Sequence, residues 1–125
     1  MKSEETKQAG TCGLNEAMAV IGGKWKSTIL WELHLKPARF GALRRRILGI
    51  SEKVLFEQLR QLEADGVVRR DAFDEVPQRV EYSLTLAGSS LNDAVHALAE
   101  WGKRHAMSLD SGAPMTSKRT SAAAA

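Results

Sequence analysis

The sequence is poor in cysteine and has no long apolar run. Its single cysteine, Cys12, excludes an intrachain disulfide framework and fits the reducing cytoplasm, where we expect the protein to act. No apolar run approaches the roughly 20 residues that span a bilayer, and residues 1–10 lack the apolar stretch of a signal peptide. We therefore expect no membrane partner.

Residue clusters that carry catalysis or metal binding are also missing. His34, His96 and His105 do not have metal-ligand spacing, and one cysteine cannot complete a zinc cluster. The chain has no glycine-rich phosphate loop and no serine with a matched histidine and aspartate. The sequence thus predicts no enzyme, no cofactor and no metal site, and we interpret the three histidines as surface or packing residues.

Length and composition indicate one domain with modest tails. The chain has 125 residues, of which 43% are hydrophobic and 26% are charged, as in ordinary globular proteins. We expect a flexible arm at 1–11, a folded domain at 12–109 and a disordered tail at 110–125. The tail is rich in Ala, Ser and Thr, which cannot bury a core.

Hydrophobic spacing predicts three short helices in the first half of the chain. The first covers 14–21 and stops at a glycine pair, the second covers 25–35 and stops before Pro37, and the third covers 42–48. The expected buried positions of the second and third helices are Ile29, Leu30, Leu33, Leu43 and Ile47.

A fourth helix, at 52–65, has the clearest start and stop signals. Ser51 can cap its N-terminus and Gly66 can close its C-terminus, while Leu55, Leu59 and Leu62 form one apolar face. The opposite face carries Lys53, Val54, Glu57, Arg60 and Gln61. Such a face can read base edges and phosphates, although an ordinary amphipathic helix has the same pattern.

Two strands and a long helix follow. Strands are expected at 67–73 and 80–84 around a loop at 74–79, and a very short strand at 39–40 can pair with them. Thr85 is the expected N-cap of the last helix. The predicted fold is α+β and mostly helical, a winged helix-turn-helix with a two-stranded wing, which puts the fourth helix in the major groove of DNA.

Charge is unevenly distributed along the chain. Residues 36–60 contain seven Lys and Arg against two acids, an excess of five, whereas residues 80–110 contain four acids against two bases. A basic sector of this kind favours double-stranded DNA as the partner, and a solvated helix face is the alternative. The residues expected at the DNA are Lys24, Lys26, Arg39, Arg44, Arg45, Ser51, Lys53, Val54, Glu57, Arg60, Gln61 and Arg79.

Three members of this set have explicit alternatives. The lysines at 24 and 26 open the second helix and can grip a phosphate, or they can be solvated. Arg79 flanks the wing turn and can enter a minor groove, while Arg69 or Arg70 can pair with Glu75 or Glu81 across the hairpin.

Four blocks of the sequence resemble the HxlR-type family of bacterial winged-helix transcription regulators, which are MarR-like. They are Val-Ile-Gly-Gly-Lys-Trp-Lys at 20–26, Arg-Phe-Gly-Ala-Leu-Arg-Arg at 39–45, the capped helix at 49–66, and the wing at 76–85. The resemblance covers about residues 12–102.

The resemblance implies a homodimer held by the first and last helices, binding a palindromic operator. The interface residues we expect are Leu14, Met18, Leu91, Ala94, Val95, Leu98 and Trp101. It also implies a redox-sensing cysteine at Cys12, which precedes the first helix, where the positive helix end favours the reactive thiolate. Family members usually carry proline after that cysteine, whereas Gly13 follows here.

The function predicted from these features is a sequence-specific transcriptional repressor that responds to a small oxidant or electrophile through Cys12. Two alternatives stay open: a winged helix used for protein contacts, and a regulator that responds to a non-electrophilic ligand, in which case Cys12 is an inert small residue.

Overall fold

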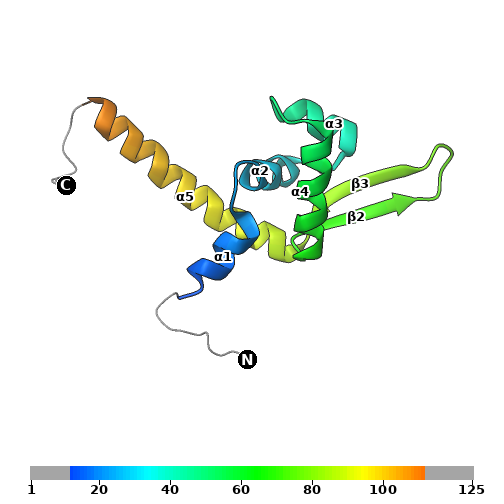
Figure 1. Ribbon diagram of the computed structural model, residues 1–125, viewed down its shortest axis with the longest axis horizontal. Coiled ribbons are helices and arrows are strands. Elements are labelled where there is room, and N and C mark those ends of the chain that lie inside the picture. Colours follow the sequence, from blue (N-terminus) through cyan, green and yellow to red (C-terminus); the bar gives the residue numbers. More distant parts are fainter. Residues whose placement is uncertain (1–11, 112–125) are drawn as a thin grey trace. The chain divides into compact units, whose positions relative to one another are not determined.

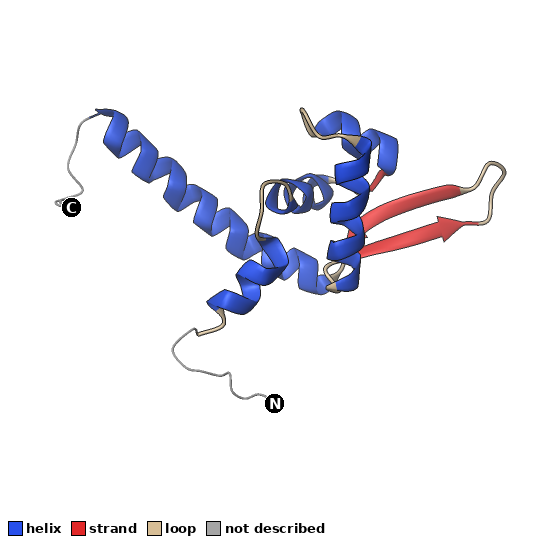
Figure 2. Cartoon of the chain, in the orientation of Figure 1, coloured by secondary structure: helices blue, strands red, loops and turns tan. Residues whose placement is uncertain are grey.

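A computed structural model describes residues 12–111 (Figure 1). Within this range the elements are α1 (Leu14–Ile21), α2 (Lys26–Leu35), β1 (Ala38–Arg39), α3 (Phe40–Arg46), α4 (Glu52–Ala64), β2 (Val68–Phe73), β3 (Arg79–Leu84) and α5 (Leu86–Ser111). This arrangement of helices and a small sheet confirms the predicted α+β winged-helix class (Figure 2).

The ends of α4 form as the sequence predicts. The Ser51 Oγ accepts a hydrogen bond from the Val54 N–H at 3.1 Å, which satisfies one of the free donors at the helix start. At the other end Gly66 has a φ of 78°, and the N–H of Val67 donates to the Leu62 carbonyl at 3.1 Å. This is the Schellman arrangement, in which glycine supplies the left-handed residue.

The sheet has three antiparallel strands in the order β1-β3-β2. β2 and β3 form the wing hairpin, with Val68 opposite Leu84 and Phe73 opposite Arg79. β1 adds Ala38 opposite Tyr82, which confirms the very short strand predicted beside the wing.

α3 begins at Phe40 and ends at Arg46, two residues earlier at each end than the predicted 42–48. The helix stops because Ile47 turns to extended backbone and buries its side chain, with 3% of the residue exposed. Ile47 is inward as predicted, although it lies just beyond the helix.

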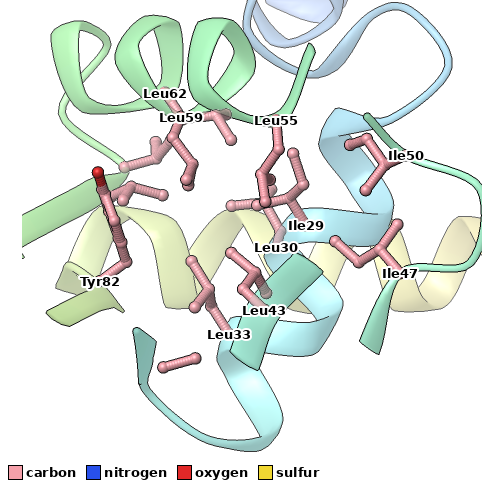
Figure 3. Close-up of a cluster of buried hydrophobic side chains, with 13 residues drawn as sticks. Ile29, Leu30, Leu33, Leu43, Ile47, Ile50, Leu55, Leu59, Leu62 and Tyr82 are labelled. Atoms are coloured by element: carbon pink, nitrogen blue, oxygen red, sulfur yellow. The ribbon is translucent and has the colours of Figure 1, made fainter. Parts of the chain in front are cut away.

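One apolar cluster joins α2, α3, α4 and the sheet (Figure 3). α2 contributes Ile29, Leu30 and Leu33, α3 contributes Leu43, and α4 contributes Leu55, Leu59 and Leu62, all essentially inaccessible to solvent. Each buried aliphatic side chain stabilises the fold by about 1.5–3 kcal/mol relative to exposure. This burial fixes which face of α4 remains outside.

Thr85 joins the wing to α5. Its hydroxyl donates to the Gly66 carbonyl at 2.7 Å and accepts from the Gly88 N–H at 3.0 Å, which confirms it as the N-cap of the last helix. One threonine therefore ties the end of α4 to the start of α5.

The chain divides into two compact units, one ending at Asn92 and the other beginning at Asp93. The second unit contains the part of α5 after Asn92, and the helix continues through Ser111, beyond the predicted domain end at 109. The predicted arm at 1–11 and the predicted tail from 112 onward lie outside the described residues.

Gly88 marks a place where no side chain fits. A Cβ at Gly88 would overlap the carbonyl oxygen of Val67, which already accepts the Thr85 N–H at 3.2 Å. We expect Gly88→Ala to lower the free energy of unfolding by about 2–3 kcal/mol, because the strand end and the helix must move apart. Denaturant unfolding measures the change.

Gly41→Ala is the matched control. Gly41 also lies in a helix, but the nearest atom to its Cβ position is the flexible end of Arg45, at 3.5 Å. This substitution should stabilise the protein by about 0.5–1 kcal/mol through helix propensity. Equal effects at both glycines would contradict the steric explanation.

Candidate nucleic-acid interface

The outer face of α4 carries charged and amide groups. Lys53, Glu57, Arg60 and Gln61 are exposed, and with Phe56 they line a shallow depression. Groups of this kind donate to guanine, accept from cytosine and contact phosphates. The face has the chemistry needed to read a DNA groove.

Val54 does not belong to this face. Its side chain is half-buried and packs against the apolar cluster, although the sequence analysis places it among the base-reading residues. It lies at the border of the buried stripe, where a branched apolar side chain gains more from the core than from solvent. The prediction for Val54 is therefore corrected.

The turn between α3 and α4 is basic and open. Arg44 and Arg45 are exposed and line a second shallow depression together with Ser51. The Arg44 guanidinium lies 3.7 Å from the Glu52 carboxylate, but both groups face solvent, so the pairing is weak. Both arginines remain accessible to a phosphate.

Arg46, the third arginine of the run, has a structural contact instead. Its guanidinium donates to the carbonyl oxygens of Glu32 at 3.2 Å and Lys36 at 3.0 Å. The Glu32 carbonyl, in the last turn of α2, also accepts the N–H of Lys36 at 3.3 Å, and Lys36 is the C-cap of that helix. Arg46 thus fastens α3 to α2.

The two lysines that open α2 differ in exposure. Lys24 is exposed, with its ammonium 4.8 Å from the centroid of the Trp25 ring. Lys26 is only 7% exposed, because the first turn of α2 packs its stem into the protein. The prediction that Lys26 grips a phosphate is corrected on this ground, while Lys24 stays a candidate.

Arg79 is held inside the wing. Its guanidinium forms ion pairs of 2.9 Å with both Glu75 and Glu81, and its central carbon lies 3.8 Å from the Phe73 ring centroid. A minor-groove contact by Arg79 would have to compete with these ion pairs, which use three of its five N–H donors, and its role at DNA stays a prediction. The sequence analysis assigned the pairing with these acids to Arg69 or Arg70, but Arg69 contacts Asp71 at 3.2 Å instead.

The ion pairs of the wing perturb the ionisation of both partners. The hydrogen bond from Arg79 lowers the pKa of the Glu75 carboxyl below its ordinary value, and the same bond raises the pKa of Arg79. The pair therefore stays charged through the neutral range.

Phe56 is a surface residue that the sequence analysis missed. It is 48% exposed, and the Arg60 guanidinium carbon lies 5.7 Å from its ring centroid. An aromatic residue in an amphipathic helix is ordinarily assigned to the core. Its spacing from Leu55, about 100° around the helix, was the available signal that it faces outward.

The predicted dimer residues are mostly exposed apolar groups. On α1, Leu14 is 64% exposed and Met18 45%, while on α5, Leu98 is 59% exposed and Trp101 51%. Leu91 is different, because it is half-buried and packs against the apolar cluster of its own chain, and its place in the interface stays a prediction. Of the other two, Ala94 is exposed and Val95 is half-buried.

Comparison with known proteins identifies the family to which this chain belongs. The model of the HxlR-like helix-turn-helix family matches residues 20–110. The chain belongs to this family. An uncharacterized HTH-type transcriptional regulator of Bacillus subtilis, YkvN, is 43% identical over 96 residues, which cover 77% of this chain and 81% of YkvN.

Two solved structures agree with this family membership. HypR, described as a redox regulator and solved in its reduced form, has 40% identity and a TM-score of 0.72, covering 78% of this chain and 97% of HypR. The transcriptional regulator YodB from B. subtilis, also in its reduced form, has 29% identity and a TM-score of 0.69, covering 77% of this chain and 94% of YodB.

This HxlR-like chain is therefore a DNA-binding transcriptional regulator of helix-turn-helix type, and its relatives are named as regulators, not as enzymes. Between residues 12 and 111, no helix is long and apolar enough to cross a membrane. The same residues contain no group of three or more His, Cys, Asp or Glu that could hold a metal.

The start of α1 has two consecutive residues at positive φ. Cys12 is exposed with a φ of 54°, and Gly13, the N-cap residue, has a φ of 83°. A proline ring holds φ near about −65° and cannot adopt the backbone of Gly13. The backbone seen here therefore requires a residue other than proline after Cys12.

Lys53 allows a direct test of the α4 face. We expect Lys53→Ala to weaken DNA binding and to reduce the slope of log affinity against log salt by about one unit, because one phosphate contact is lost. The fold should be unchanged, since the side chain is exposed. Fluorescence anisotropy at several salt concentrations measures both quantities.

Lys103→Ala removes the same charge from α5, where Lys103 pairs with Glu100 at 3.5 Å. It should leave both the affinity and the salt slope unchanged. A matching loss in the two variants would mean that net charge, and not the α4 face, determines binding.

Proposed function

We propose that this regulator is a homodimeric repressor that binds a palindromic DNA operator and is released by oxidants or electrophiles acting on Cys12. The observation that carries the DNA-binding part is the outward polar face of α4 with Lys53, Arg60 and Gln61, which is capped by Ser51 and preceded by the exposed arginines of α3. A helix so placed after a tight turn fits the major groove.

We propose that the operator is contacted by the exposed polar residues of α4 and by the exposed cations that flank it. The α4 residues would read bases and phosphates, and the flanking cations would hold the backbone. They are Lys24, Arg39, Arg44, Arg45, Ser51, Lys53, Glu57, Arg60 and Gln61.

The deciding experiment is a selection of duplexes from a random DNA pool by the full-length protein, together with a binding assay on DNA flanking its own gene. We expect a palindromic sequence whose binding weakens steeply with salt, because several phosphates are neutralised in each half-site. Recovery of no sequence, or an affinity that stays flat with salt, would favour the alternative that the winged helix makes protein contacts.

The homodimer is supported by the second unit of the chain. Among residues 93–110 no side chain is fully buried, and Leu98, Trp101 and Leu109, which share one helix face, are all more than half exposed. A single helix with exposed apolar groups is marginally stable in water, because most helical stability comes from packing. A second copy of the same helix can cover this face and would set two α4 helices about 34 Å apart, one DNA turn.

We expect Leu98→Glu to give folded monomers that do not bind the operator, since a charge in the centre of the proposed interface would have to be buried. Sedimentation velocity measures the mass, and anisotropy measures operator binding. Lys103→Glu, which changes an exposed α5 residue on the opposite helix face, should remain dimeric. If Leu98→Glu sediments as a dimer, the interface lies elsewhere.

The redox part is proposed for Cys12. Its thiol is exposed, and a non-glycine residue at a positive φ costs about 1–2 kcal/mol, so its backbone can relax if the thiol is modified. Two Cys12 thiols of a homodimer can give two electrons and two protons to the oxidant and form one S–S bond. The similar protein HypR is described as a redox regulator.

We expect diamide or a quinone to weaken operator binding by the wild type, and Cys12→Ser to abolish this response. If the dimer has two packings that differ in operator affinity, a bias of a few kcal/mol between them is sufficient to weaken operator binding. Operator binding with and without oxidant, followed by reduction with dithiothreitol, measures the effect. If both proteins respond alike, Cys12 is a packing residue and the inducer is a non-electrophilic ligand.

A further inference from the structure

Phe56 is an apolar group in a position where it does not stabilise the fold. The buried stripe of α4 is complete with Leu55, Leu59 and Leu62, and the Phe56 ring lies outside it, 48% exposed. Burying such a ring stabilises a protein, whereas leaving half of it in water forfeits much of that gain. Its placement on the outer face of α4 therefore calls for a partner.

The surroundings of Phe56 are polar and basic. The ring shares one shallow depression with Lys53, Glu57, Arg60 and Gln61. Arg60, one helical turn further, has its guanidinium carbon 5.7 Å from the ring centroid, within the range of a cation–π contact. The ring therefore limits the directions in which the guanidinium of Arg60 can point.

This pairing of an aromatic ring with a guanidinium matches two features of a DNA major groove. The apolar feature is the 5-methyl group of a pyrimidine, which thymine carries, and phenylalanine is one of the side chains that contact it. The strongest acceptor pair is O6 and N7 of guanine, which arginine binds with two hydrogen bonds. A protein partner could also cover the ring, but the basic residues at 44, 45, 53 and 60 favour a polyanion.

We propose that the Phe56 ring contacts the 5-methyl group of a pyrimidine in the major groove of the operator, beside a guanine bound by Arg60. This inference rests on the proposed operator binding by α4. It makes Phe56 a specificity residue, because a methyl group distinguishes thymine from cytosine and from uracil without any hydrogen bond.

The test uses the duplex that the full-length protein selects from a random pool. Each thymine of one half-site, and its symmetry mate, is replaced by deoxyuridine, which removes only the methyl group. We expect one position at which wild-type binding falls about fourfold per half-site, the value of one buried methyl group. Binding by Phe56→Ala should be weaker overall and should not change with this replacement.

A second arm identifies the source of the methyl group. At the sensitive position the T·A pair is replaced by C·G and by 5-methylcytosine·G. Tighter wild-type binding to the methylated cytosine means that the ring accepts the methyl group of either base, and equal binding means that thymine is the base read. Both results support a methyl contact by Phe56, provided that Phe56→Ala has lost the sensitivity.

Leu86→Ala is the control, because Leu86 is 92% exposed at the start of α5 and does not line the depression that contains Phe56. It should keep the wild-type response to deoxyuridine. Thermal melting checks that Phe56→Ala is folded, and the deoxyuridine series on the wild type does not depend on any variant.

The outcomes separate this inference from the proposed function. If no duplex is selected, the proposed operator binding fails and this inference fails with it. If a duplex is bound but no deoxyuridine position matters, or Phe56→Ala keeps the wild-type sensitivity, operator binding stands and the role of Phe56 is overturned.

Discussion

The burial of one side of α4 is the constraint on which the rest of the molecule depends. Leu55, Leu59 and Leu62 are inaccessible to solvent, and they hold the helix against α2 and the sheet (Figure 3). Because a helix has only one rotation that buries this stripe, the residues presented to solvent are fixed at the same time. The packing that stabilises the fold therefore also determines which face of α4 is available as the proposed DNA-reading face.

The features predicted best were those set by local chemistry. The Ser51 cap, the Gly66 stop and the Thr85 cap each involve partners a few residues away, so the sequence was sufficient to place the helix ends. The two wing strands followed from the hairpin pattern, whereas the strand order was not predicted, and boundary errors such as that of α3 amount to two residues.

The features that the sequence did not reveal depend on tertiary neighbours. The burial of Lys26 and the assignment of Val54 to the core require knowing what packs beside them. Arg79 was assigned to DNA because it flanks the wing turn, but its donors are directed to Glu75 and Glu81 across a hairpin whose register was unknown. The exposed position of Phe56 contradicts the usual location of its residue type, so only the helix rotation reveals it.

The neutralised wing also has a kinetic consequence. Residues 68–84 contain three arginines against four acids, a net charge of −1, whereas residues 36–60 carry a net charge of +5 from seven bases and two acids. Long-range attraction to a polyanion acts on net charge and decays within about 10 Å at moderate salt. We therefore expect the first encounter with a duplex to be steered by the basic stretch at 36–60 and not by the wing, whose charges are paired within the hairpin.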